Sequence, residues 1–337
     1  MHFHFRNVND AFRTLVEQID DGTVPTSTNK SRAGEVRMVR EPVIVSYSNP
    51  WERVLLSPGR DCNPFFHLFE ALWMLAGRND VEPLLYYNPR MAEFSDHGVT
   101  LRGAYGFRWR WTWEDQLHEI VRQLKEDRDS RRVVLTMWDP SQDLFMNPSK
   151  DKCCNTHAYF AIRAGELDMT VCNRSNDLVW GMLGANAVHF AFLQEYLAAR
   201  IGVPMGNYHQ MTNNLHVYTE RWEPEKWLAG FLDWGVSYPK ADTDVRLVKD
   251  ADVFDYEVGN FIDSIDGEWS EPFLRDVAQP MMAAFRAHKQ RRYHGDQCAL
   301  ELMTRVQHED WQKAGMEWIN RRMDAWKEKS SVTSSAE

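Results

Sequence analysis

The sequence predicts an α+β protein in which helices cover a mixed sheet. Segments with apolar residues at helical spacing interleave along the chain with β-branched or alternating segments. The 337 residues are 43% hydrophobic and 12% aromatic, which supplies enough apolar material for a sizeable core. Residues 64–77 and 187–201 are apolar nearly all round, as buried helices are, so we expect these two helices to cover the sheet.

Local signals predict where the elements begin and end. Helices are predicted over residues 8–20, 64–77, 114–127 and 187–201. Strands are predicted over residues 133–138, 156–164 and 166–174, the first of them buried and the last two joined as a hairpin at Gly165-Glu166. The polar residues 23–35 are expected to be mobile, residues 266–329 to form a helical C-terminal extension, and residues 330–337 to be a disordered tail.

Charge and cysteine usage restrict the class of function. The net charge of -10 argues against binding to polymeric nucleic acid, which relies on clustered Lys and Arg. The cysteines are odd in number and widely spread, which predicts reduced thiols: Cys62, Cys153, Cys154, Cys172 and Cys298. No apolar run approaches the roughly 20 residues of a membrane span, and the start, MHFHFRNVNDAF, lacks the pattern of a secretion signal. A cytoplasmic protein without a membrane partner is expected.

Two adjacent cysteines, Cys153 and Cys154, lie just before a predicted strand. A nucleophilic thiol reacts as its thiolate, and nearby arginines or a helix end can lower the thiol pKa to supply it. The alternative is that one or both are small buried apolar residues. Adjacent cysteines without a second pair do not fit the spacing of a zinc site, so no metal is expected.

Arginines and one glutamate are the other candidates. Arg131-Arg132 precede one predicted strand and Arg174-Ser175 follow another, and guanidinium groups bind phosphate oxygens bidentately. Taken singly, each arginine would be a surface charge, and only convergence on one site would make it more. Glu70 lies within an apolar helix, where an unpaired carboxylate is expensive to bury. It is therefore either a general acid or base or a structural group paired with an Arg or a Trp.

Nine segments in order are similar to the thymidylate synthase superfamily, which includes thymidylate synthases and pyrimidine nucleotide hydroxymethylases. The matching segments are SRAG (31–34), EALWMLAG (70–77), AYGFRWR (104–110), DSRRVVLTMW (129–138), Cys154 before a strand, RSND (174–177), GANAVHF (184–190), LHVY (215–218) and VFDY (253–256). The resemblance runs from about residue 8 to about residue 265, which sets the bounds of a predicted catalytic domain at 1–265.

The resemblance implies catalytic roles for four residues. Cys154 would be the nucleophile, because the segment from it to Arg174 aligns without a gap and Cys153 falls one residue outside. Glu70 and Tyr105 would order the water network for proton transfers. Asp177 would face the pterin of 5,10-methylenetetrahydrofolate, the implied co-substrate.

The resemblance also implies how the nucleotide monophosphate is held. Its phosphate would be bound by Arg32, Arg131, Arg132, Arg174 and Ser175. Asn186 would face the pyrimidine edge, and His216 with Tyr218 the sugar hydroxyl. The family architecture implies a homodimer through the sheet, in which Arg131 and Arg132 reach the partner's site, and a location in the cytoplasm of a bacterium or a phage-infected host.

Three departures from the family pattern stand out. Asn155, rather than the usual His, follows the nucleophile. The segment GANAVH, which resembles a Gly-containing loop running into a helix, has one residue more than the standard loop, so Ala185 is the gapless alternative to Asn186. The C-terminus lacks the short apolar end that closes over folate in thymidylate synthases.

The implied activity is one-carbon transfer from methylenetetrahydrofolate to C5 of a pyrimidine deoxynucleotide monophosphate. Ser175 and Arg132 match members that use deoxynucleotides, and Asn186 can pair with uracil or cytosine, with dUMP favoured over dCMP. Without the closing end, and with residues 88–98 lacking the family's Trp-rich stretch, water is expected to add and give the 5-hydroxymethyl nucleotide.

Three alternatives to hydroxymethylation were open from the sequence. The chain could be a thymidylate synthase that makes dTMP from dUMP, or a nucleotide-binding homologue that has lost catalysis. It could also be a cysteine peptidase that uses Cys154 with His157 or His216, although nothing else in the sequence indicates an acyl-transfer site.

Overall fold

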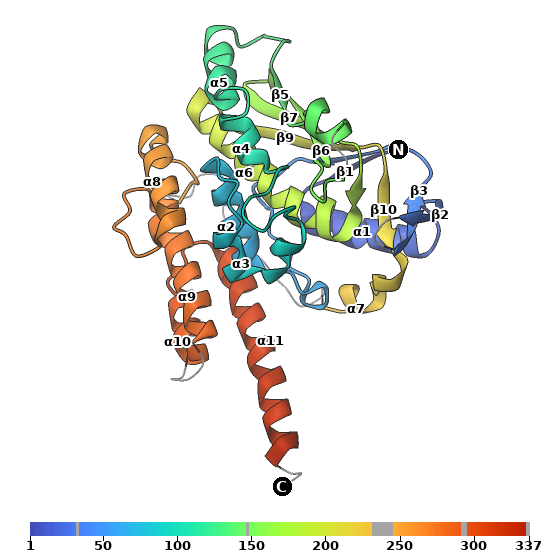
Figure 1. Ribbon diagram of the computed structural model, residues 1–337, viewed down its shortest axis with the longest axis vertical. Helices are drawn as coiled ribbons and strands as arrows, with labels where there is room; N and C mark the ends of the chain where they lie inside the picture. The colour runs from blue at the N-terminus through green and yellow to red at the C-terminus, as the bar shows by residue number, and fades with distance from the viewer. Residues whose placement is uncertain (32–33, 146–147, 231–244, 291–294, 335–337) are drawn as a thin grey trace.

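The protein is described here from a computed structural model, which covers residues 1–31, 34–145, 148–230, 245–290 and 295–334, with side chains through residue 326. Figure 1 shows a sheet with helices packed against it, and the C-terminal helices standing beside α2. In the described residues, no helix combines the length and apolar character that crossing a membrane requires.

The main sheet has six strands in the order β1-β4-β9-β7-β6-β5. Their bounds are β1 His2–Phe5, β4 Val43–Tyr47, β5 Val134–Thr136, β6 Asn155–Arg163, β7 Glu166–Asn173 and β9 Met205–Thr212. β1 runs parallel to β4 and β7 parallel to β9, whereas the other neighbours are antiparallel. The sheet is therefore mixed, and the predicted α+β class is confirmed.

A second, smaller sheet has the order β2-β3-β10-β8. Its strands are β2 Thr26–Ser31, β3 Gly34–Val39, β8 Asn176–Asp177 and β10 Leu215–Tyr218. Most of the stretch 23–35, predicted to be mobile, instead forms β2 and the start of β3, which pair along the whole length of β2. Residues 32 and 33 lie outside the described part of the chain. β2 is a polar edge strand, so its order comes from backbone pairing, which composition does not reveal.

The predicted helices are present with small shifts. They are α1 Val8–Asp20, α2 Pro64–Leu75, α5 Gln116–Glu126 and α6 Asn186–Ile201. Gly202, with a φ of 84°, ends α6 because glycine adopts this left-handed conformation without steric cost. Shorter helices α3 Glu82–Tyr87, α4 Tyr105–Arg110 and α7 Pro224–Leu228 connect the larger elements.

Two strand predictions need correction. The β6–β7 hairpin turns at Ala164-Gly165, one residue earlier than predicted, and both residues have positive φ values of 51° and 86°. β5 is shorter than the predicted buried strand and lies at the sheet edge, where Val134 is 42% exposed. An apolar run alone cannot distinguish an edge strand from a central one.

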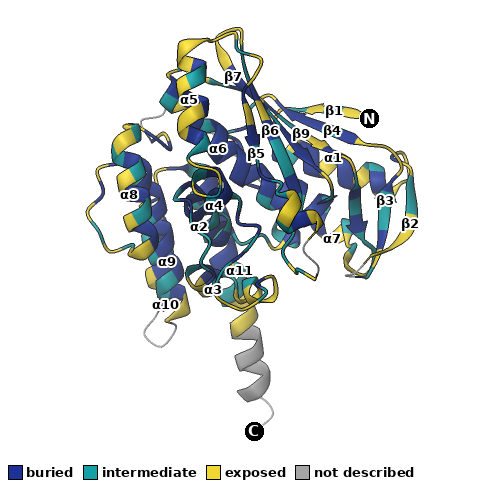
Figure 2. Ribbon diagram, turned by 45° about the horizontal axis from the view of Figure 1, so that its top comes forward, coloured by how far each residue is buried: buried dark blue, intermediate teal, exposed yellow. Residues whose placement is uncertain are grey.

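The core lies between the sheet and helices α2 and α6, and Figure 2 shows buried residues running along both helices. The C-terminal helices α8 Ala251–Asp263, α9 Gln279–Lys289, α10 Gly295–Met303 and α11 Glu309–Ser334 extend this core. The ring of Phe65 in α2 lies 5.3 Å from the rings of both Phe285 and Trp318. Side chains from the predicted extension thus pack directly on α2, while its boundary at residue 266 stays a prediction.

The backbone of α11 continues to Ser334. The disordered tail predicted for residues 330–337 stays a prediction. Residues 335–337 lie outside the described part of the chain.

Candidate active site

Cys154 lies immediately before β6, at the end of the sheet where α4 and α6 also begin. The backbone amides of Cys154 and Asn155 both donate to the Tyr105 hydroxyl oxygen, at 3.1 and 3.2 Å. Tyr105 is the first residue of α4. The next position requires glycine, because a Cβ added at Gly106 would lie 1.9 Å from the Met74 carbonyl oxygen of α2. Close helix packing thus positions the tyrosine that holds the cysteine backbone.

Among the described residues, Arg174 places a cation beside the Cys154 thiol. Its Nη2 lies 3.7 Å from the Cys154 sulfur, while its Nε donates to the Cys153 carbonyl at 2.8 Å. Burial raises the pKa of the Cys154 thiol, and Arg174 acts against this by lowering it. The net shift of the Cys154 pKa is upward, so the effect of burial is larger than that of Arg174. Among the described residues, Arg174 is the arginine that favours the thiolate.

A consequence can be measured with Arg174→Gln. Because the guanidinium favours the thiolate, its removal should raise the pKa of Cys154 further and slow alkylation of this residue by iodoacetamide severalfold between pH 7 and 9. Alkylation should accelerate as the pH rises in both proteins, because only the thiolate reacts. Peptide mass spectrometry gives the rate at Cys154. Arg163→Gln, at the far end of β6, is the matched control, and an equal effect there would contradict the assignment.

Cys153 occupies a different environment. It is buried, its thiol donates to the Gly103 carbonyl oxygen at 3.4 Å, and burial raises its pKa well above the ordinary value. Beneath it, Arg108 and Asp143 form a buried ion pair, and Arg108 also donates to the Met137 carbonyl at 2.6 Å. This pair ties α4 to the segment after β5 and so fixes the cysteine loop. Sequence reasoning did not single out Arg108.

Asn186 connects to the residue after the cysteine. Asn155 Nδ2 donates to Asn186 Oδ1 at 3.3 Å, and Asn186 Nδ2 donates to Asn176 Oδ1 at 3.1 Å. The predicted loop before α6 is instead a π-helix, Leu178–Ala185, that continues directly into α6. A π-helical turn holds one residue more than an α-helical turn, so this segment can absorb the extra residue and leave Asn186, not Ala185, at the amide contact.

Glu70 has a partner that the sequence did not reveal. Its Oε2 lies 3.1 Å from Nε2 of His189 in α6, and both side chains are largely buried. The partner is a histidine rather than the Arg or Trp considered from the sequence. His189 is therefore a candidate site residue, and only the packing of α2 against α6 brings it to Glu70.

Asp177 has one carboxyl oxygen without a partner in the protein. Its Oδ1 accepts from the amides of Val179 and Trp180, at 2.9 and 2.5 Å, whereas its Oδ2 is buried without a partner. Burial raises its pKa, and the nearby His216 lowers it. The unpartnered Oδ2 is an acceptor that suits a ligand with N–H groups, such as a pterin.

His216 and Tyr218 lie on β10, and Asp177 is the pairing partner of His216 on β8. The rings of His216 and Tyr218 are 5.4 Å apart, edge to face. These residues thus belong to the small sheet next to the Cys154 loop. Ser175 is partly exposed and directly follows Arg174.

Arg131 and Arg132 are exposed and precede β5. Val134 of β5 pairs with Tyr159, which lies along β6 from Asn155 by roughly 13 Å at ~3.3 Å per residue. The two arginines therefore lie away from the Cys154 of their own chain. Arg32 falls outside the described residues.

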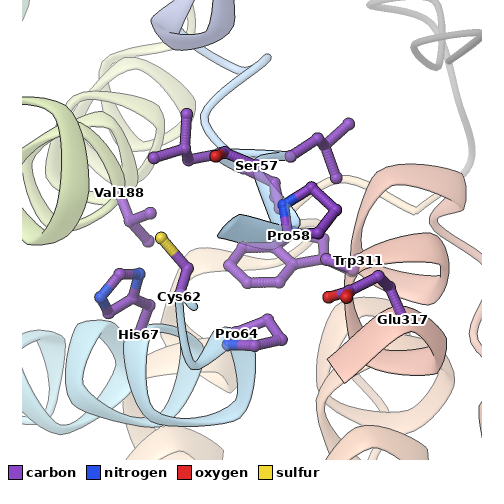
Figure 3. Close-up of a pocket in the computed structure, with 12 residues that line it drawn as sticks. Ser57, Pro58, Cys62, Pro64, His67, Val188, Trp311 and Glu317 are labelled. Carbon is purple, nitrogen blue, oxygen red and sulfur yellow. The ribbon is translucent and has the colours of Figure 1, made fainter. Parts of the chain in front are cut away.

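A separate small cavity, shown in Figure 3, lies between α11 and the segment that enters α2. Its volume is about 20 Å³, and its polar lining includes Ser57, His67 and Glu317. This space suits a single water molecule and not a nucleotide. Burial lowers the pKa of His67 to about 3, so this histidine is neutral near pH 7. Within the described residues, no group of three His, Cys, Asp or Glu could hold a metal ion.

Comparison with known proteins agrees with this arrangement. The family pattern described as thymidylate synthase matches residues 56–262. A deoxyuridylate hydroxymethyltransferase from Pseudomonas phage M6 is 44% identical over 334 residues, covering 95% of this chain and 94% of that protein. The protein of the same name from Bacillus phage SP01 is 41% identical over 56% of this chain and 52% of its own length. Since the family pattern matches more than half of the chain and one relative matches nearly all of it, the chain belongs to the thymidylate synthase family.

Proposed function

We propose that the protein transfers a one-carbon unit from methylenetetrahydrofolate to C5 of dUMP and releases 5-hydroxymethyl-dUMP. The observation that carries this is the Cys154 thiol beside Arg174, held by Tyr105 and backed by the Asn155–Asn186–Asn176 amides. Relatives named deoxyuridylate hydroxymethyltransferase, one of them similar over nearly the whole chain, support uracil as the base and hydroxymethyl as the product.

The residues have separate tasks in this reaction. Cys154 attacks C6 of the pyrimidine, so that C5 becomes a carbon nucleophile. Methylenetetrahydrofolate supplies the one-carbon unit. Glu70, paired with His189, and the Tyr105 hydroxyl order the water through which protons reach and leave the ring. Breaking of the sulfur–C6 bond restores both the aromatic base and the free thiol.

The substrates would be held from both sides of Cys154. Arg174 and Ser175 bind the phosphate together with Arg32 and, from the partner subunit of a homodimer, the arginines at 131 and 132. His216 and Tyr218 hold the sugar hydroxyl, and Asn186 faces the base. Asp177 and Trp180 receive the pterin, because a buried acceptor oxygen there has no partner within the protein.

The uncovered face of the main sheet supports the dimer. Side chains of large apolar residues on β5, β6 and β9 are exposed: Val134 42%, Tyr159 47% and Met211 40%. In the sheet, β5 lies next to β6, and β7 separates β6 from β9. A second copy placed on this sheet would bury them.

Identification of the product tests the proposed function. With dUMP and methylenetetrahydrofolate, mass spectrometry should find 5-hydroxymethyl-dUMP, with tetrahydrofolate formed and one water consumed per turnover. Absorbance should show no dihydrofolate, because hydride transfer is not part of this reaction. A methyl product with an equal amount of dihydrofolate would make the protein a thymidylate synthase. Absence of any tritium release from [5-³H]dUMP and [5-³H]dCMP would instead favour a homologue without catalysis.

A further inference from the structure

Three buried asparagines from three different elements form a continuous chain of amides behind Cys154. Asn155 begins β6, Asn186 begins α6 and Asn176 begins β8, and they are 1%, 8% and 4% exposed. The side chains connect in the order Asn155, Asn186, Asn176 through hydrogen bonds of 3.3 and 3.1 Å. None of the three is a surface group that water could satisfy in place of its neighbour.

The chain has a direction. Each amide donates to the next, which leaves one acceptor, Asn155 Oδ1, and one donor, Asn176 Nδ2, buried without partners at the two ends. An amide presents oxygen on one side and nitrogen on the other, so turning only Asn186 would oppose like groups at both contacts. The only other arrangement that keeps both hydrogen bonds turns all three amides together.

The surrounding backbone holds these side chains in place. The Tyr208 hydroxyl donates to the Asn186 carbonyl oxygen at 3.2 Å, which fixes the start of α6. Gly181 in the π-helix lets the Asn176 amide approach closely, since an added Cβ would lie 2.3 Å from Asn176 Oδ1. The amides are therefore packed against elements that cannot easily move.

The direction decides what Asn186 offers to a base. After its two contacts, Asn186 has one N–H and one oxygen lone pair left. Uracil presents an N3–H donor beside an O4 acceptor, whereas cytosine presents an N3 acceptor beside an amino donor. Reversal of the chain exchanges the two positions on Asn186, so one direction suits uracil and the other cytosine.

We propose that Asn155 and Asn176 are specificity-determining positioning residues, which fix the orientation of the Asn186 amide and thereby select uracil over cytosine. The inference rests on the proposed function, in which Asn186 faces the base. It adds two residues to the determinants of the substrate and gives a role to the Asn that follows the nucleophile in this chain.

Carboxylates at the two ends should act in opposite directions. A carboxylate only accepts hydrogen bonds, so Asn176→Asp keeps Asn186 Nδ2 turned toward residue 176, which is the direction found here. Asn155→Asp demands a donor from Asn186 on the other side and favours the reversed direction. With tritium release from [5-³H]dUMP and [5-³H]dCMP, the ratio of kcat/KM for dUMP over dCMP should be kept or increased in Asn176→Asp. The ratio should fall by at least about tenfold in Asn155→Asp, as expected for one mismatched hydrogen bond.

Asn173→Asp is the matched control. Asn173 is 3% exposed, faces Asn155 across the β6–β7 pair and also has an unpartnered Oδ1, but it lies outside the amide chain. Its replacement should lower kcat/KM for both nucleotides alike and leave the ratio within about twofold, since any effect would come from packing. Thermal unfolding identifies variants that do not fold.

If the carboxylate variants do not fold, the neutral variants Asn155→Ala and Asn176→Ala decide. Each alanine removes one of the two hydrogen bonds that orient the Asn186 amide. Both variants should therefore move the ratio of kcat/KM for dUMP over dCMP toward one. An unchanged ratio in folded Asn155→Asp, or in both alanine variants where that protein does not fold, would overturn this inference while the wild type stays active. A ratio that falls in Asn176→Asp as it does in Asn155→Asp would overturn it as well. A wild type that releases tritium from neither nucleotide would instead overturn the proposed function.

Discussion

Cys154→Ser is expected to lower kcat/KM for dUMP on the order of 10⁴-fold or more, whereas Cys153→Ser should keep most of the activity. The reason is that a serine hydroxyl is a far weaker nucleophile than a thiolate and cannot form the bond to C6 at a useful rate. Arg174 reaches the Cys154 sulfur, while the Cys153 thiol donates to the Gly103 carbonyl. Tritium release from [5-³H]dUMP measures both variants.

Cys153→Ser is also the packing control. Its smaller hydroxyl can still donate to Gly103, so folding and dUMP binding should change little. Equal losses in the two variants would show that the pair acts only through packing, and full turnover by Cys154→Ser would exclude it as the nucleophile. Intact mass spectrometry after incubation with 5-fluoro-dUMP and methylenetetrahydrofolate should find a covalent adduct in Cys153→Ser and none in Cys154→Ser.

Mixing two inactive variants is expected to restore about one quarter of the wild-type activity. In a dimer of Cys154→Ser with a chain carrying Arg131→Ala and Arg132→Ala, one of the two sites has both its own cysteine and the partner's arginines. Random pairing makes half of all dimers mixed, and each mixed dimer has one intact site of two. Arginines acting within their own chain would instead leave a defect in every site.

Two different affinity tags allow the mixed dimer to be purified, and its activity should then approach half that of the wild type. Each parent variant alone is the control and should be nearly inactive. Sedimentation checks that all three are dimers. If the mixed dimer is as inactive as its parents, the proposal that Arg131 and Arg132 reach the partner's site fails.

Local signals in the sequence were sufficient for the four helices α1, α2, α5 and α6. Asn63 and Pro64 begin α2, and Gly202 ends α6, because capping and the left-handed conformation depend on neighbouring residues alone. The polar strand β2 was missed because its stability comes from backbone pairing with β3. The edge position of β5 was also not predictable, since it depends on which strands pair in the completed sheet.

The candidate site was predicted where the family pattern is contiguous. Cys154, Tyr105 and Arg174 were named from the sequence, and the structure brings them into contact. His189 and Asn176 were not named as site residues, because their contacts with Glu70 and Asn186 exist only after separate elements have packed. A polar residue in a buried helix, such as His189, was the one signal that could have indicated a partner.

The packing of α11 on α2 can form only late in the synthesis of the chain. Arg321 in α11 pairs with Asp61 just before α2, and these residues are 260 positions apart. At roughly 5–20 residues per second, translation leaves the apolar start of α2 without this cover for roughly 10 to 50 s. This part of the core can therefore form only after α11 has been translated, and until then the start of α2 lacks its cover by α11.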